Sequence, residues 1–259
     1  MKFDLVPYGT PFHLYLTIQS LRLVNLQLRV FDTATKRVYS QRYLTVNGNS
    51  KVLLKLPIVP DRLTVELVEA NSPHETPVFR ITEINVVKDM KCPDELTEQD
   101  KKFITFIKWF ACTCSRLETG MIYQSDGFSI LYHDKIMEGG IEETTPARID
   151  KVTGLIHVSK NRTKDYTIPM LIVMLIHEYA HLTKNKEYGK AESNELTADL
   201  IACHITLNLG FDSYEVRHCF EEVFSRKKTD LNKLRMTAIN EFIGIFEANE
   251  GNRCKTRRA

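Results

Sequence analysis

Residues 168–185 read IPMLIVMLIHEYAHLTKN, and this stretch organises the second part of the chain. Its first nine residues, 168–176, are apolar on every side of a helix, which is typical of a helix that runs through a protein core. His177 and His181 follow at a spacing of four, which places both imidazoles on one helix face with Glu178 beside them. Such polar groups at the end of a buried helix would be costly without a partner, so the stretch predicts a metal site.

The spacing H-E-x-x-H is the arrangement of zinc hydrolases, in which two neutral imidazoles hold the ion and the glutamate acts as a base. Such a site needs a third protein ligand, and residues 191–199 downstream read AESNELTAD. On a helix, Glu192, Glu195 and Asp199 share one face, because they lie at i, i+3 and i+7. This face supplies the missing carboxylate.

The pairing of these two segments resembles the gluzincin branch of the zincin metallopeptidases, whose second signature is E-x-x-A-D or a close variant on a following helix. Residues 195–199, ELTAD, fit that signature position by position. The resemblance implies that Glu195 is the third zinc ligand, that Glu178 is the catalytic base, and that Asp199 accepts a hydrogen bond from a liganding histidine. Glu192 stays open as a rival ligand, and Asp199 as a ligand would be the aspzincin pattern, whose G-T-x-D context is absent. The residues after the first motif lack the glycine and third histidine of metzincins.

The first 90 residues show a different pattern, with apolar residues alternating with more polar ones at a period of two. Turn-forming sites such as Asn47-Gly48-Asn49 interrupt the alternation. The pattern predicts six to eight short strands in an antiparallel β-sandwich of immunoglobulin-like or jelly-roll type. A sandwich placed before an enzyme domain suggests docking to a protein partner, an expectation that rests on analogy.

Residues 91–250 are expected to form a mainly helical zincin-like domain with a small sheet, so the whole chain belongs to the α+β class. Thr97 with Asp100 resembles a capping box. Asp126-Gly127 marks a hairpin within residues 121–136, and Gly210 is expected to end the helix that starts near Glu195. Helical stripes of apolar residues begin at Phe103, Val216 and Leu231. Residues 251–259 form a basic tail.

Residues 155–159, after Thr153-Gly154, predict another short strand. In the zincin fold the strand before the active-site helix is an edge that pairs with extended substrate. By this analogy peptide binding is expected at Gly154, Leu155, Ile156, His157 and Val158. An ordinary interior strand is the alternative reading.

No second motif identifies a residue that would stabilise the oxyanion of a tetrahedral intermediate. Tyr214 and Arg235 are candidates without further support. His204 is nine residues past Glu195 and should face away from it, and His218 lies off the apolar stripe of its helix.

Composition sets the remaining expectations. The chain has 259 residues, a formal net charge of +2 and 43% hydrophobic residues, which is ordinary for a soluble globular protein and gives no general attraction to nucleic acid or membrane. The first residues resemble no signal peptide, so a cytoplasmic location with six reduced cysteines is expected. The predicted function is a zinc peptidase, and endopeptidase cleavage is expected. The alternative is a zincin-like assembly protein, such as a virion component, docked by its β-sandwich.

Overall fold

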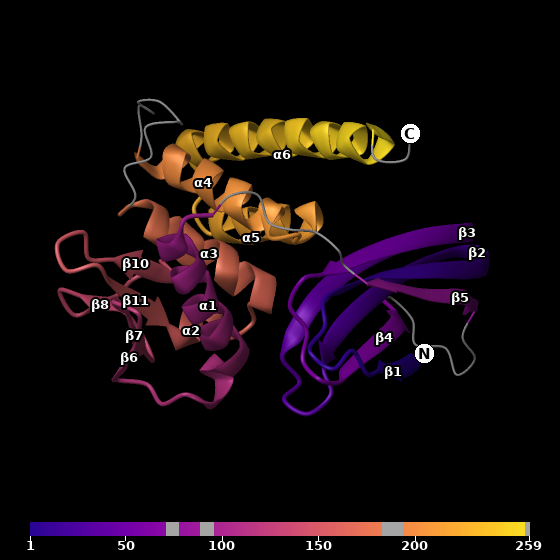
Figure 1. Cartoon of the computed structure of the whole chain (residues 1–259), viewed down its shortest axis with the longest axis horizontal. Helices are drawn as coiled ribbons and strands as arrows, with labels where there is room; N and C mark the ends of the chain where they lie inside the picture. The colour runs from indigo at the N-terminus through magenta and orange to yellow at the C-terminus, as the bar shows by residue number, and fades with distance from the viewer. Residues whose placement is uncertain (71–77, 89–95, 183–193, 257–259) are drawn as a thin grey trace. The chain divides into compact units, whose positions relative to one another are not determined.

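A computed structural model describes residues 1–70, 78–88, 96–182 and 194–256, and it contains both sheets and helices (Figure 1). This composition confirms the α+β class. The chain divides into two compact units. The first comprises Met1–Glu95, Tyr166–Pro169 and Leu209–Asp212, and the second comprises Leu96–Asp165, Met170–Asn208 and Ser213–Ala259.

The first unit is built on a five-stranded antiparallel sheet in which β2 is central. The strands are β1 (Lys2–Leu5), β2 (Phe12–Asp32), β3 (Val38–Leu56), β4 (Leu63–Glu69) and β5 (Phe79–Lys88). The order is β1-β4-β2-β3, and β5 pairs with the first part of β2 while β4 pairs with its second part. The docking role expected for this sheet stays a prediction.

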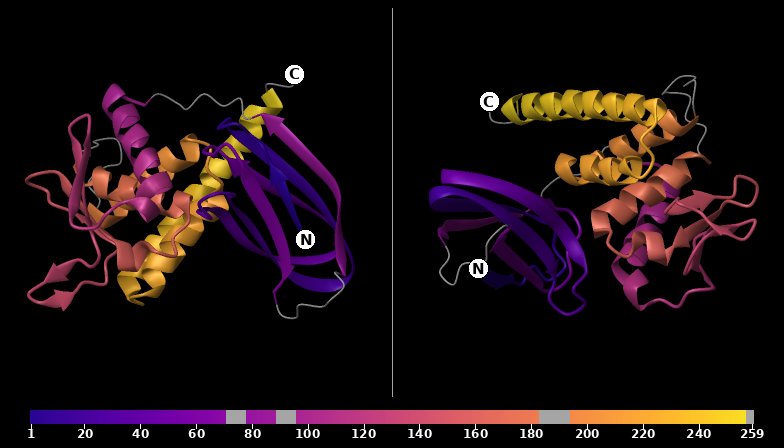
Figure 2. Two further views of the ribbon diagram at one scale, coloured as in Figure 1. Left: turned by 90° about the horizontal axis from the view of Figure 1, so that it is seen from below. Right: turned by 180° about the vertical axis from the view of Figure 1, so that it is seen from behind.

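Two features of this sheet correct the expected sandwich of six to eight short strands. The strands form one hydrogen-bonded sheet, which curls on itself (Figure 2), rather than two packed sheets. The pairing of β2 with β3 shifts by two residues between Ser20 and Val24 and then continues. Because a shift of two keeps the same residues on the same face, Leu14 and Leu26 both point into the core and are fully buried. The two alternating segments on either side of this shift, which predict two short strands, are therefore parts of one long strand, β2.

The second unit opens with α1 (Glu98–Thr113), followed by a 3₁₀ turn at Cys114–Arg116. The predicted capping box is confirmed, since the Thr97 side chain accepts from the backbone N–H of Asp100 and the Asp100 carboxylate accepts from that of Thr97. The apolar stripe that begins at Phe103 is buried. The Asp100 carboxylate also accepts a hydrogen bond of 2.9 Å from the Tyr179 hydroxyl, which ties α1 to α3 (Ile168–Ala180).

A four-stranded mixed sheet of order β10-β11-β7-β6 lies in the second unit. Its strands are β6 (Met121–Ser125), β7 (Phe128–His133), β10 (Ala147–Ile149) and β11 (Leu155–Ser159), and the short pair β8 (Met137–Glu138) and β9 (Ile141–Glu142) stands apart. The hairpin at Asp126-Gly127 is confirmed, and both residues have positive φ, as a tight hairpin turn requires.

The expected edge position of residues 154–158 is wrong. β11 pairs with β10 on one side and β7 on the other, so its backbone groups are used within the sheet. β10 occupies the edge instead. The three residues Ala147–Ile149 follow Pro146 and are too few to show an alternating pattern, which is why the sequence did not reveal this strand.

The remaining helices are α2 (Lys160–Thr163), α3, α4 (Asn194–Asn208), α5 (Ser213–Ser225) and α6 (Asp230–Thr256). α6 packs against α4 and α5, and its last residues include the described part of the basic tail. Gly210 has a φ of 88° just beyond α4, the conformation expected of a residue that ends a helix. No helix within the described ranges combines the length and apolar character needed to cross a membrane.

Candidate metal centre

The two motif histidines lie at the carboxyl end of α3. Residues 168 and 170–176 of this helix are at most 5% exposed, so the helix is held on all sides by packing. α3 ends at Ala180, and the N–H of His181 donates to the carbonyl of Glu178 in a tighter final turn. The rings of His177 and His181 are 4.9 Å apart between centroids and nearly perpendicular. Both imidazoles therefore face one point in space.

Glu195, in the first turn of α4, completes the cluster. Its Oε2 lies 3.5 Å from Nε2 of His177, and its Oε1 lies 3.5 Å from Nε2 of His181. Donor atoms roughly 3.3 Å apart suit a tetrahedral ion with bonds of about 2 Å, so these three side chains fit a metal ion with a fourth position left open. Within the described part of the chain, these three residues form the group of His, Cys, Asp and Glu side chains whose ligand atoms lie close enough together to hold one metal ion. The rival ligand Glu192 lies outside the described residues.

Asp199, one helical turn after Glu195, contacts the other side of the His177 ring. Its Oδ1 lies 2.9 Å from Nδ1 of His177, and the side chain is completely buried. This position leaves Nε2 of His177 free for a metal and fixes the tautomer that presents it. The geometry thus places Asp199 behind a ligand rather than among the ligands.

Arg235 of α6 holds Asp199 in place. Its Nε donates to Oδ2 at 2.6 Å and its Nη2 donates to Oδ1 at 2.9 Å, while Nη2 also lies 3.3 Å from Oε2 of Glu195. The guanidinium carbon lies 4.5 Å from the centre of the Phe224 ring. Nε and Nη2 of Arg235 are thus engaged by the carboxylates of Asp199 and Glu195. A fully buried aspartate requires a cation, but no spacing in the sequence indicates that Arg235 supplies it.

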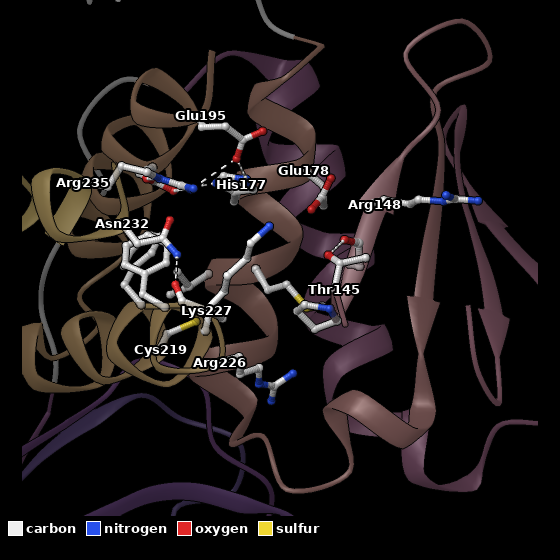
Figure 3. A pocket seen from close by; sticks show the side chains of 18 of the residues that line it. Thr145, Arg148, His177, Glu178, Glu195, Cys219, Arg226, Lys227, Asn232 and Arg235 are labelled. Carbon is white, nitrogen blue, oxygen red and sulfur yellow. Dashed lines mark hydrogen bonds and ion pairs between the residues drawn. The ribbon is translucent and has the colours of Figure 1, made fainter. Parts of the chain in front are cut away.

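Glu178 lies beside the cluster, on the side of His177 that faces β10 (Figure 3). It is 8% exposed, and it accepts a hydrogen bond from the backbone of Ile149. Burial raises the pKa of Glu178, partly offset by the positive charge of His177. A carboxylate with a raised pKa is suited to exchange protons near neutral pH.

The electrostatics of the cluster follow from its contacts. Burial alone would lower the pKa of His177, but its hydrogen bonds to Asp199 and Glu195 raise that pKa to about 10. Burial and the neighbouring charge of His177 lower the pKa of His181 to about 4. The hydrogen bond from His177 lowers the pKa of Glu195 to about 2. The cluster without metal therefore carries a protonated His177 between two carboxylates.

A cavity of about 610 Å³ opens in front of this cluster. Three walls enclose it: residues 144–151 around β10, α3, and the ends of α5 and α6 with the loop between them (Figure 3). The wall formed by α3, α5 and α6 is largely apolar, including Met174, Phe220 and Phe224. The arrangement can therefore hold an extended ligand against the cluster.

β10 offers free backbone groups to this cavity. The neighbouring residues Pro146 and Asp150 share backbone hydrogen bonds with β11, so the alternate residues Ala147 and Ile149 direct their N–H and C=O groups to the open edge. The Ala147 carbonyl already accepts from the Thr145 hydroxyl, and the Ile149 N–H donates to the Glu178 carboxylate. The remaining outward groups are those with which an added strand could pair.

Other residues considered from the sequence lie elsewhere. His157 forms a hydrogen bond of 2.9 Å with His133, and residues 154–158 do not line the cavity. His204 lies near Phe242 and His218 near Tyr214, all outside the cavity lining. Cys114, Cys203 and Cys219 are buried free thiols, and Cys112 is a half-buried one. Cys92 and the side chain of Cys254 lie outside the described part.

Comparison with known proteins was made by family models, by curated sequences and by solved structures. None of the three found a match for this chain.

Proposed function

We propose that the protein is a zinc-dependent peptidase that uses His177, His181 and Glu195 as metal ligands and Glu178 as the general base. The observation that carries the proposal is the convergence of the three donor groups on one point, with a buried carboxylate and a cavity beside them. Two imidazoles and one carboxylate form a ligand set used by catalytic zinc, which keeps an open fourth position. The proximity of Glu195 to both His177 and His181, at 3.5 Å each, supports this assignment of the ligands.

A bound zinc ion and the side chains of the protein would contribute different parts of the reaction. When bound, zinc would supply a Lewis acid that lowers the pKa of water to about 7 and polarises a carbonyl. Glu178 accepts the proton of the attacking water and delivers it to the amine that leaves when the peptide bond breaks. Its raised pKa suits both transfers, because the group must gain and lose a proton near neutral pH. Asp199 and Arg235 keep the His177 ring oriented throughout.

The substrate is proposed to lie along β10 in an extended conformation. The Ala147 N–H and the Ile149 carbonyl would pair with the peptide backbone, and Glu178 lies next to this edge because it accepts from the Ile149 N–H. A peptide in this position passes both the base and the metal cluster. Extended peptide is therefore favoured over a compact folded substrate.

The substitution Glu178→Gln tests the proposal, because it removes the base while keeping the shape of the side chain. We expect zinc content to be unchanged and hydrolysis of a mixture of fluorescence-quenched peptides to fall at least about a hundredfold. The matched control is Glu221→Gln, an exposed glutamate of α5 that does not line the cavity, which should hydrolyse the mixture like the unaltered protein. Equal turnover by the Glu178→Gln protein would rule out this mechanism.

The assembly role remains the alternative proposal. It requires neither a base nor a cavity, so the position of Glu178 beside an open 610 Å³ space favours the enzyme. A zinc-loaded protein that hydrolyses none of the peptides and sediments as a large complex would favour assembly instead.

A further inference from the structure

A lysine in the loop between α5 and α6 enters the same cavity. The backbone of Lys227 is fixed, since its N–H donates to the carbonyl of Phe224, and its carbonyl accepts from the N–H of Thr229 and from the side-chain amide of Asn232. The side chain extends from this loop into the cavity, toward the end that holds His177 and Glu178 (Figure 3). The loop thus aims a positive charge at the space in front of the cluster.

The arginines around the cavity have hydrogen-bond or ion-pair partners. Arg235 is bound to Asp199, and Arg148 pairs with Glu143 at 2.7 Å and points away from the cavity (Figure 3). Arg226 donates to the carbonyl of Arg162 and lies near Glu222. Among the residues that the structure describes, the Lys227 ammonium has no hydrogen-bond or ion-pair partner of its own.

The surroundings of Lys227 define what its charge can bind. Val173, Met174, Phe220, Val223 and Leu231 supply apolar surface in the same cavity. A single ammonium beside an apolar wall suits a group with an apolar body and one negative charge, because a phosphate would call for several converging donors. The chemistry favours a carboxylate.

We propose that Lys227 selects peptide substrates that place a carboxylate in this cavity, from either an acidic side chain or a free carboxyl terminus. The inference rests on the proposed peptidase function and adds the substrate class. Lys151, on the turn after β10, also lines the cavity, and its charge acts on Glu178 and His181 at the metal cluster. Lys227 lies on the side of the cavity that α5 and α6 form, next to the apolar residues.

The test uses four mixtures of fluorescence-quenched peptides, randomised except at one fixed position. That position is Glu or Gln, and each mixture is made with a carboxyl-terminal acid or amide. For the zinc-loaded protein we expect kcat/KM to be about tenfold higher for Glu than for Gln, or for acid than for amide, as an exposed charge-assisted hydrogen bond would give. The pair of mixtures that differs identifies the source of the carboxylate.

Substitutions at Lys227 test whether this residue causes the preference for a carboxylate. Lys227→Met should bring the ratio of kcat/KM between the charged and the neutral mixtures to about one, and Lys227→Glu should invert the preference. Lys228→Met is the matched control, since Lys228 is exposed in the same loop and does not line the cavity, and it should keep the preference.

Two failures are distinguishable. Cleavage without any preference, or with a preference that survives in Lys227→Met, would overturn the inference and leave the peptidase intact. Absence of cleavage of all four mixtures would contradict the peptidase itself, and the inference would be withdrawn with it.

Discussion

At the residue scale, one chain of contacts connects α6 to the metal cluster. Arg235 binds Asp199 through two hydrogen bonds, Asp199 lies 2.9 Å from His177, and the opposite nitrogen of His177 faces the cluster. Each member fixes the orientation of the next, so the histidine is aligned before any ion arrives. Groups in this position typically change metal affinity ten- to a hundredfold.

Replacing Arg235 with Met should therefore weaken zinc binding by roughly ten- to a hundredfold. It should also destabilise the protein by about 3 kcal/mol, because it removes the guanidinium partner of a buried carboxylate. Competition with a chelator and urea unfolding would measure the two effects. Lys233→Met, at an exposed site on the same helix, is the control, and unchanged zinc affinity in Arg235→Met would contradict the positioning role.

Protonation of His177 makes zinc binding depend on pH. Its pKa of about 10 in the metal-free protein lies above the ordinary value of 6.5, so the stabilising contribution of the protonated ring is complete below about pH 6.5 and lost as pH rises through 10. A metal requires the neutral ring, so binding must displace this proton. His181 and Glu195, with pKa values of about 4 and 2, have already lost theirs at pH 7.

We therefore expect about one proton to be released per zinc ion at pH 7, with affinity rising about tenfold per pH unit. Calorimetry in two buffers of different protonation enthalpy would count the protons. Binding without proton release at pH 7 would show that His177 is already neutral.

At the element scale, α1 supports α3, the helix that carries His177. The ring of Phe103 stacks on Tyr179 at 4.1 Å between centroids, and the Tyr179 hydroxyl binds the same Asp100 that caps α1. A cap and a contact between helices thus share one carboxylate.

Thr97→Ala should lower the free energy of unfolding by about 1 kcal/mol, the usual cost of a lost helix cap. Asp100→Ala should cost about 2 kcal/mol, because the Tyr179 hydroxyl also loses its partner. Urea unfolding would compare them with Lys102→Ala, an exposed position on the same helix. Equal losses in the two cap variants would show that the Tyr179 contact contributes nothing.

Local pattern predicts some elements of this chain better than others. The cap at Thr97, the hairpin at Asp126-Gly127 and the buried stripes that begin at Phe103 and Val216 are set by neighbouring residues, and the sequence predicts them. The stripe expected to begin at Leu231 is wrong, because Leu231 is 51% exposed and Ile239 and Ile243 are buried instead. The edge position of β10 depends on which strands pair, and the continuity of β2 depends on a register shift at Ser20. Neither property is encoded by local alternation.

The same distinction applies to the site. His177, His181 and Glu195 follow fixed spacings on two helices, so the sequence predicts that they meet. Arg235 and Lys227 reach the site only because α6 packs against α4 and α5. Residues that long-range packing brings together have no fixed separation in the sequence, so the sequence alone does not predict that they meet.

At the scale of the whole molecule, the candidate site belongs to one unit. All residues that line the cavity lie in the second unit, which has its own core around Phe103, Phe110 and Ile172. The curled sheet of the first unit buries a separate core that includes Leu14, Leu26 and Leu67. Metal binding should accordingly stabilise the second unit directly.

The most direct measurement is zinc content per chain by elemental analysis, before and after zinc loading, in the unaltered protein, Glu178→Gln and Glu195→Ala. We expect about one zinc ion per chain in the first two and loss of zinc in Glu195→Ala, because only Glu195 of these two glutamates is a proposed ligand. Zinc retained in full by Glu195→Ala would assign the third ligand to another residue. A zinc-loaded protein that still holds no zinc would contradict the metal centre itself.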